Sequence, residues 1–217
     1  MPKIKLLVFD LDGTLFDTAA DIADSVNHAL DEYHVPTYSV SQIKKMIGHG
    51  ARNLIENALG EKQQHLIDDA LSKFLVHYHA YCTVRTQIYP GVLEFFNKVS
   101  HTPKALLTNK PKIPSVKILE KWNLQKEFVQ AIFGDGRFPK KPEPLGLRYI
   151  LKETNTDPDE ALLIGDGVPD MLVARVLKVP SLAILGGYGD RHDLIGTSPS
   201  FVVEAFQEIA NLIESLC

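Results

Sequence analysis

Cysteine is scarce in this sequence, which has only Cys82 and Cys217 among its 217 residues. These two thiols lack the close spacing of metal ligands, so we expect free cysteines in a reducing cytosol, with a disulfide between them as the less favoured alternative. Long apolar runs are also missing, since none approaches the roughly 18 residues that a membrane-spanning helix needs. Residues 1–5 lead straight into a strand with no small-residue cleavage site, so we expect no signal peptide and a cytoplasmic location.

Charge of one sign does not accumulate along the chain. The 23 basic and 27 acidic residues are interspersed and leave a net charge of −4. Proteins that bind nucleic acid or anionic membranes usually carry a basic block, and this sequence has none. We therefore expect no nucleic acid and no membrane among its partners, and a small molecule instead. The oligomeric state stays open between a monomer and a homodimer.

An apolar run, residues 6–9, ends in two carboxylates two positions apart, Asp10 and Asp12, followed by Gly13. Such a run is typical of a strand buried on both faces. Asp10 then falls at the carboxyl end of the strand, where open parallel sheets bind ligands. Two nearby carboxylates repel each other and are costly to bury unless a positive group lies between them. The alternative is an ordinary strand followed by an Asp-Gly turn.

The spacing of apolar residues changes after this motif. Residues 17–85 hold almost no strand-like run, and apolar residues recur there at helical spacing over residues 19–30, 43–47, 54–59 and 66–78. After Tyr89, helices and strands alternate. In that part we expect strands over residues 105–108, 129–133, 161–164 and 181–185, and helices over residues 92–99, 113–122, 142–151, 171–176 and 203–216.

Strands that alternate with helices predict a parallel sheet covered on both faces. The expected fold class is α/β: a doubly wound, Rossmann-like core of residues 1–15 and 87–217, with an inserted all-helical cap of residues 16–86. Because the insert follows Asp10 so closely, it must sit over the edge at which Asp10 lies, which is the position of a lid.

Asp10 and Asp12 suit the two carboxylate roles of phosphoryl transfer. Asp10 can attack a phosphoryl group and form an aspartyl-phosphate, which divides a hard hydrolysis into two easier steps. Asp12 would be the general acid/base that protonates the leaving oxygen and then deprotonates the attacking water. Both roles need a cation, because a phosphate dianion repels a carboxylate, and Mg²⁺ with its oxygen ligands fits.

Later strand ends carry further polar groups. Asp166 ends the apolar run of residues 161–164, and Asp170 begins the next helix at a spacing that lets it face the same edge. For either residue alone, helix capping or a turn is the simpler interpretation. The pair gains weight because the first motif needs a metal partner from another strand end.

Two other segments suit phosphate. Thr108 and Asn109 offer a hydroxyl and backbone N–H groups where a helix begins, although such a pair is also an ordinary helix cap. A lysine at position 140 or 141 would neutralise a phosphoryl group in transfer, and the alternative is a solvated basic turn.

Together these stretches resemble the haloacid dehalogenase-like hydrolases, and among them the phosphoglycolate phosphatase-type enzymes with a helical cap. The resemblance covers essentially the whole chain and rests on residues 10–18 (Asp-Leu-Asp-Gly-Thr-Leu-Phe-Asp-Thr), 47–50 (Ile-Gly-His-Gly), 89–92 (Tyr-Pro-Gly-Val), 107–111 (Leu-Thr-Asn-Lys-Pro), 140–144 (Lys-Lys-Pro-Glu-Pro) and 164–167 (Ile-Gly-Asp-Gly).

The resemblance implies specific roles. The implied Mg²⁺ ligands are Asp10, Asp12, Asp166 and Asp170, the last as a ligand or as an acid just behind the ligands. The implied phosphate-binding residues are Thr108, Asn109 and Lys141, with Lys140 as the alternative lysine. Two departures stand out: Gly167 replaces a common Ser or Thr, and Leu177-Lys178 replaces a usual Ala-Gly pair.

Substrate choice is expected to come from the cap. Its best candidate loop contains Gly48, His49, Gly50 and Arg52. The glycines allow close approach, and His49 or Arg52 could meet a substrate carboxylate. The alternative is an inter-helix turn with exposed polar residues.

We therefore predict a Mg²⁺-dependent phosphatase of a small phosphomonoester, with 2-phosphoglycolate as the leading substrate and pyrophosphate, sugar phosphates or nucleotides as alternatives. Phosphomutases of the same superfamily place a histidine where this chain has Ile22, and dehalogenases lack the acid at Asp12. Phosphonate hydrolysis would need a Schiff-base lysine, for which Lys44, Lys45 and Lys62 are present. A non-catalytic binding protein is least favoured, because all proposed catalytic side chains are present.

Overall fold

A six-stranded parallel sheet forms the core of the structure, a computed structural model that describes residues 3–33 and 35–210. In chain order its strands are β1 (Leu6–Phe9), β4 (Lys104–Leu107), β5 (Phe128–Ile132), β6 (Ala161–Gly165), β7 (Ser181–Ile184) and β8 (Phe201–Val203). Their order across the sheet is β5-β4-β1-β6-β7-β8. The chain therefore adds strands on one side of β1 before it crosses to the other side.

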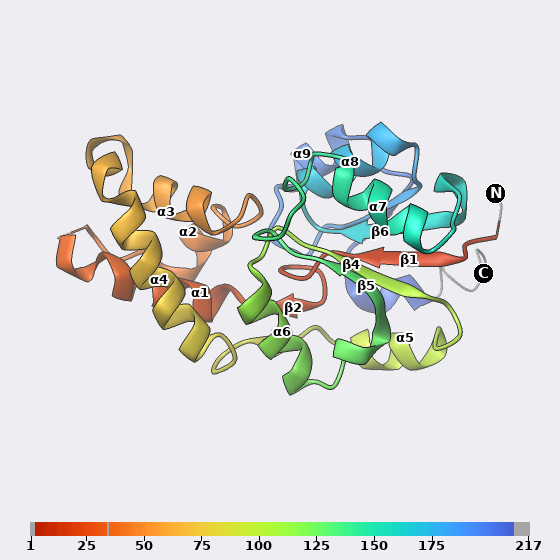
Figure 1. Cartoon of the computed structure of the whole chain (residues 1–217), viewed down its shortest axis with the longest axis horizontal. Helices are drawn as coiled ribbons and strands as arrows, with labels where there is room; N and C mark the ends of the chain where they lie inside the picture. Colours follow the sequence, from red (N-terminus) through yellow and green to blue (C-terminus); the bar gives the residue numbers. More distant parts are fainter. Residues whose placement is uncertain (1–2, 34, 211–217) are drawn as a thin grey trace.

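The α-helices of the described residues are α1 (Ala19–Leu30), α2 (Val40–Lys44), α3 (Ala51–Leu59), α4 (Ile67–Tyr81), α5 (Val92–Lys98), α6 (Lys112–Lys121), α7 (Leu145–Glu153), α8 (Val168–Leu177) and α9 (Arg191–Gly196). Figure 1 shows α7 and α8 on one face of the sheet and α5 and α6 on the other.

Strand β1 shows how the sequence produces these layers. All four of its residues are buried, and successive side chains of a strand point to opposite faces. Leu7 and Phe9 join the apolar cluster that includes α5 and α6, whereas Leu6 and Val8 join the cluster of α7 and α8. The expected doubly wound, Rossmann-like α/β core is confirmed.

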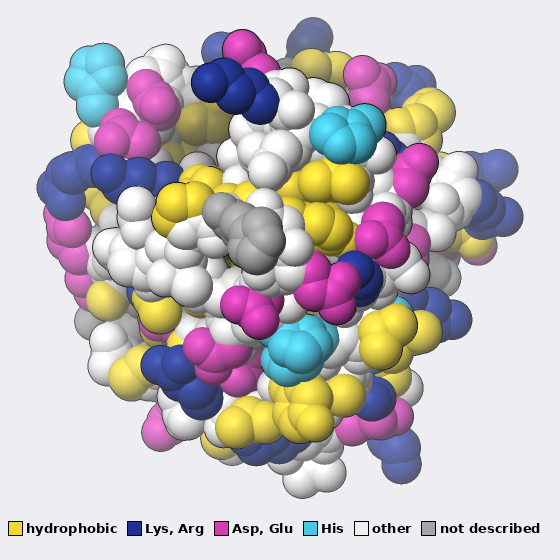
Figure 2. All heavy atoms as spheres, turned by 90° about the vertical axis from the view of Figure 1, so that its left-hand side faces the viewer, with side chains coloured by type: hydrophobic (Ala, Val, Ile, Leu, Met, Phe, Trp, Pro, Cys, Tyr) yellow, Lys and Arg dark blue, Asp and Glu magenta, His cyan; other side chains and the backbone are white. Residues whose placement is uncertain are grey.

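Helices α1–α4 form a group of their own beside the carboxyl ends of the strands (Figure 1). Helices α1 and α4 pack along each other, and Val26 and Phe74 are buried between the helices at the positions that helical spacing indicated. Helix α2 begins after Ser39, whose side chain forms a capping box with Gln42. Figure 2 shows that acidic and basic side chains are mixed on the outer face of this group.

A short antiparallel ribbon joins this group to the core. Strand β2 (Phe16–Asp17) pairs with β3 (Gln87–Ile88) where the chain leaves the core and returns to it. The buried carboxylate of Asp21 accepts hydrogen bonds from the backbone N–H groups of Arg85 and Thr86, which holds the two connections together. The sequence did not indicate this ribbon, and the cap boundaries at residues 16 and 86 stay a prediction.

The expected helix over residues 203–216 is wrong at its start. Phe201–Val203 form β8, parallel to β7, because two β-branched valines in a row favour a strand that can pair with a free sheet edge. Helix α9 was not expected. The end of that predicted helix, residues 211–216, lies outside the described residues, as does Cys217, while Cys82 is buried. No helix in the described ranges is long and apolar enough to cross a membrane.

Candidate active site

A cavity of about 580 Å³ lies between the carboxyl edge of the sheet and helices α1–α4. Asp10, Thr108 and Asp166 line it from the ends of β1, β4 and β6, and Ile22 and Phe74 line it from the helices. This position follows from the topology, because ligands of open α/β sheets bind where the chain crosses from one half of the sheet to the other.

Three carboxylates converge in this cavity. Asp10 follows β1, Asp166 follows β6, and Asp170 lies in the first turn of α8. One oxygen of each lies within 4.8 Å of the others. Asp170 also accepts a hydrogen bond of 3.0 Å from the backbone N–H of Gly167, so it caps its helix and faces the other acids at once.

Burial makes these acids costly to ionise. It raises the pKa of Asp166 from 3.8 to about 8, and the charge of Asp10 adds to that rise. Burial also raises the pKa of Asp170 to about 6, although the ammonium group of Lys141 opposes the change. Asp10 Oδ1 is buried and accepts no hydrogen bond from the described residues. Crowded buried carboxylates, one of whose oxygens accepts no hydrogen bond, form a site that a cation would stabilise.

Lys141 is the basic member of this group. Its buried ammonium nitrogen lies 2.9 Å from Asp10 Oδ1 and 2.5 Å from Asp170 Oδ1. The contact with Asp10 is an ion pair by distance but lacks the alignment of a hydrogen bond. Burial lowers the pKa of Lys141, but the two carboxylates outweigh burial and raise it. Lys140, the alternative lysine, lies instead beside Gly50.

The carboxylate of Asp12 has different partners. Lys110 Nζ lies 2.9 Å from its Oδ1 and 3.1 Å from its Oδ2, and the hydroxyl of Thr18 donates to Oδ1 at 2.7 Å. Asp12 is therefore not in the three-acid group that the described residues form. Of the four expected metal ligands, the side chains of Asp10, Asp166 and Asp170 lie together. The carboxylate of Asp12 lies apart from them because Lys110 and Thr18 hold it.

Thr108 and Asn109 follow β4 and both line the cavity. The hydroxyl of Thr108 accepts a hydrogen bond of 3.2 Å from the backbone N–H of Lys110. The amide of Asn109 donates to the carbonyls of Gly48 and Lys141 and accepts from the N–H of Lys141. Its side chain thus ties the segment that carries Lys141 to the loop between α2 and α3.

That loop reaches the cavity, as expected. Gly48, His49 and Gly50 all line it. Gly50 has φ +89°, and a β-carbon there would lie 3.1 Å from the carbonyl oxygen of Asn109. Glycine at this position therefore permits the loop to pack against the core.

Arg52, the other candidate of this loop for substrate binding, does not reach the cavity. Its guanidinium group pairs with Asp68 and lies 3.8 Å from Glu56, and the residue is not among those that line the cavity. Lys45 lines the cavity instead, and its side chain has no ion pair or hydrogen bond with the described residues. Arg52 lies in the first turn of α3, where its side chain reaches Asp68 rather than the cavity.

The model of the haloacid dehalogenase-like hydrolases matches residues 7–184 of this chain. The chain belongs to this family. A phosphoglycolate phosphatase of Colwellia psychrerythraea is 33% identical over 214 residues, which cover 94% of this chain and 95% of the relative. One of Mesorhizobium japonicum is 34% identical over 212 residues and covers 94% and 92%. The crystal structure of a predicted phosphoglycolate phosphatase from Haemophilus somnus 129PT has a TM-score of 0.90 at 25% identity and covers 98% and 99%.

In this haloacid dehalogenase-like hydrolase, three residues that sequence reasoning missed hold Asp166 in place. The hydroxyl of Thr14 and the backbone N–H of Tyr188 each donate to its carboxylate at 2.7 Å. Gly13 has φ +79°, and a β-carbon there would lie 2.0 Å from Asp166 Oδ2. Tyr188 lies in a glycine-rich stretch after β7. Because it follows a strand of the same sheet, the sequence could have indicated that it lies at the edge where the acids meet.

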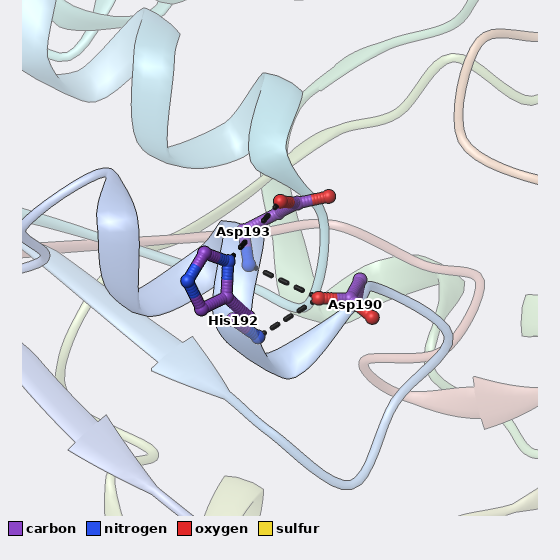
Figure 3. A group of neighbouring side chains, drawn as sticks. All are labelled: Asp190, His192 and Asp193. Atoms are coloured by element: carbon purple, nitrogen blue, oxygen red, sulfur yellow. Dashed lines mark hydrogen bonds and ion pairs between the residues drawn. The ribbon is translucent and has the colours of Figure 1, made fainter.

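Asp190, His192 and Asp193 form a second group of possible metal ligands in the hydrolase (Figure 3), and Asp190 and Asp193 line the cavity. The carboxylate of Asp190 accepts hydrogen bonds from the backbone N–H groups of His192 and Asp193 at 2.9 and 3.1 Å. All three residues are exposed. Their arrangement is that of an N-cap at the start of α9, and capping is sufficient to explain it.

The two departures from the family pattern have local consequences. Gly167 is the residue before α8, and its backbone N–H rather than a side chain makes the bond to Asp170. Lys178 ends α8 in the left-handed conformation, with φ +58° and ψ +31°. That conformation is the one glycine adopts without strain, which accounts for the usual glycine at this position.

Proposed function

We propose that this hydrolase is a Mg²⁺-dependent phosphomonoesterase that acts through an aspartyl-phosphate on a small phosphorylated metabolite, with 2-phosphoglycolate as its leading substrate. The observation that carries the proposal is the meeting of Asp10 with Lys141, Asp166 and Asp170 at one strand edge. Asp10 is the nucleophile, and the ammonium group of Lys141 offsets the charge of a phosphoryl group beside it.

The reaction takes two steps. Asp10 attacks phosphorus, the bond to the leaving oxygen breaks, and the proton of Asp12 goes to that oxygen. Asp12 then takes a proton from a water molecule whose oxygen attacks phosphorus, and the bond to Asp10 breaks to release phosphate. Thr108 supports the phosphoryl oxygens from the end of β4.

The residues present fit Mg²⁺. The three converging carboxylates offer oxygen atoms alone, which is the donor type that a hard cation prefers. Asp10, Asp166 and Asp170 would hold the ion, which supplies positive charge when bound and so lets a carboxylate approach a phosphate dianion.

Helices α1–α4, as a cap of residues 16–86, supply the substrate preference. Lys45 and His49 line the cavity opposite the three acids and can meet a second negative group on the substrate. 2-Phosphoglycolate carries such a carboxylate, and the relatives from Colwellia and Mesorhizobium are phosphoglycolate phosphatases. We place the enzyme in the cytoplasm, where Cys82 stays reduced.

The mutase alternative lacks a supporting residue, whereas phosphonate hydrolysis keeps one candidate lysine, Lys45, in the cavity. Ile22 is buried and lines the cavity where a mutase would need a proton carrier, and its side chain cannot transfer a proton. Lys44, a candidate Schiff-base lysine, lies 3.0 Å from Asp17 and is therefore engaged in an ion pair.

The test is a screen of phosphorylated metabolites in Mg²⁺, with phosphate release measured as kcat/KM. We expect 2-phosphoglycolate to rank above pyrophosphate, sugar phosphates and nucleotides. Asp10→Asn should abolish turnover of every substrate, whereas the surface variant Asp159→Asn should keep it. An Asp10→Asn enzyme with most of its activity would refute the nucleophile, and a different best substrate would refute the substrate assignment alone.

A further inference from the structure

One buried lysine of the cavity has no role in the two steps above. Lys110 follows Asn109, and its side chain is 2% exposed. An ammonium group is costly to bury unless polar or negative groups replace the lost water. Lys110 Nζ has two partners among the described residues: the carboxylate of Asp12, at 2.9 and 3.1 Å, and the hydroxyl of Tyr78, to which it donates at 2.5 Å.

Tyr78 comes from the inserted helices, not from the core. It lies on α4, is buried, and stacks on Phe74 with 5.3 Å between the ring centroids. Helix α4 is itself attached to α6, because Lys117 and Lys121 donate hydrogen bonds of 2.6 Å to backbone carbonyls near its carboxyl end. The phenol that meets Lys110 is therefore held in a fixed place.

The contact matters for the first chemical step. A carboxyl group can turn about two side-chain torsions, and Asp12 must keep one oxygen beside the leaving oxygen of the substrate. Lys110 and Thr18 restrict that rotation from two directions. When Asp12 gives up its proton it becomes a carboxylate, and the adjacent ammonium group stabilises the charge that develops there.

We propose that Lys110, held by the hydroxyl of Tyr78, is a positioning residue for proton donation by Asp12, so that the inserted helices take part in expelling the leaving group. The proposal rests on the proposed function, since it assumes that Asp12 is the general acid.

The test compares leaving groups. A p-nitrophenolate leaves as a stable anion and needs little help from an acid, whereas the alkoxide of glycolate must be protonated as it leaves. The value of kcat/KM reports only the steps up to loss of the leaving group, so slow release of phosphate does not mask the effect. For Lys110→Met we expect kcat/KM to fall about 100-fold for 2-phosphoglycolate and less than about 5-fold for p-nitrophenyl phosphate, because general acid catalysis is worth about 100-fold or more.

Tyr78→Phe removes one oxygen and keeps the ring, so the variant should fold. Its kcat/KM should also fall more for 2-phosphoglycolate than for p-nitrophenyl phosphate, but the loss for 2-phosphoglycolate should be smaller, about 10-fold. The matched controls are Lys152→Met and Tyr81→Phe, which change an exposed lysine of α7 and a tyrosine without contact to Asp12, and both should behave as wild type. In an Asp12→Asn enzyme, Lys110→Met should add little, because the two residues act as one unit.

Equal losses on both substrates, or no loss on either, would overturn the positioning role. Additive losses in the Asp12→Asn background would overturn it as well. Failure of the proposed function looks different, because wild-type enzyme would then release no phosphate in Mg²⁺ or the Asp10→Asn variant would remain active.

Discussion

Replacing Asp166 by asparagine should make the metal-free enzyme more stable while it removes activity. The pKa of this buried carboxyl group is raised from 3.8 to about 8. Between these two values the folded protein holds a proton that the unfolded chain has lost, so stability falls as pH rises from about 4 to about 8 and is then constant. At pH 7, the difference between the pH and the ordinary pKa of 3.8 corresponds to about 4 kcal/mol of destabilisation of the folded protein. Asp166→Asn would remove this destabilisation.

The loss of a hydrogen bond offsets part of this gain in stability. Thr14 and the backbone N–H of Tyr188 both donate to the Asp166 carboxylate, and the amide group of asparagine can accept only one of these hydrogen bonds. An unpaired buried donor costs about 1–3 kcal/mol. The net expectation at pH 7 in EDTA is a gain of roughly 1–3 kcal/mol in the free energy of unfolding.

Urea denaturation in EDTA at pH 5, 7 and 8 measures this difference. The gain over wild type should grow with pH, and Mg²⁺ should stabilise wild type more than the variant because a ligand that binds the folded state raises stability. Asp193→Asn is the control, since that carboxylate is 67% exposed and should change nothing. A gain that is absent at pH 8, or equal at pH 5 and pH 8, would refute the reasoning.

Three further substitutions, with Arg52→Ala as a control, test single residues of the structure. Lys178→Gly should raise the free energy of unfolding by roughly 0.5–1 kcal/mol, because it removes the strain of a left-handed lysine at φ +58°; a loss in thermal denaturation would contradict this. Gly13→Ala should cost at least about 2 kcal/mol and abolish activity, since the new carbon would lie 2.0 Å from Asp166, and a folded, active variant would be the contrary result. Lys45→Ala should raise KM for 2-phosphoglycolate about fivefold but leave KM for phenyl phosphate unchanged, while Arg52→Ala should alter neither.

Local sequence pattern was sufficient for the groups that directly follow long apolar strands. Asp10, Thr108 and Asp166 each come after such a strand, and parallel topology brings the carboxyl ends of the strands to one edge whatever the details of packing. The doubly wound sheet was predictable for the same reason. Lys141 was chosen over Lys140 through the family resemblance, and in the structure it lies beside Asp10 and Asp170.

The remaining contacts depend on where side chains point, which spacing alone does not determine. Lys110 and Asp12 are 98 positions apart in sequence, and their pairing arises only once β1 and β4 lie side by side. Arg52 was expected to meet the substrate, but its guanidinium group pairs with Asp68, and Lys45, to which the sequence assigned no role in substrate binding, lines the cavity. Strands of two residues, such as β2, are too short to show any periodicity.

The ribbon of β2 and β3 has a wider consequence. Because the chain departs from the sheet and rejoins it at paired strands, with Asp21 bridging the two crossings, the length and sequence in between are not constrained by the distance that the core must span. A helix bundle of another size would leave the reacting carboxylates in place only if it kept the contacts of Thr18 with Asp12, of Tyr78 with Lys110 and of Asp21 with Thr86. Within that limit the insert can vary, and the range of accepted molecules would change with it.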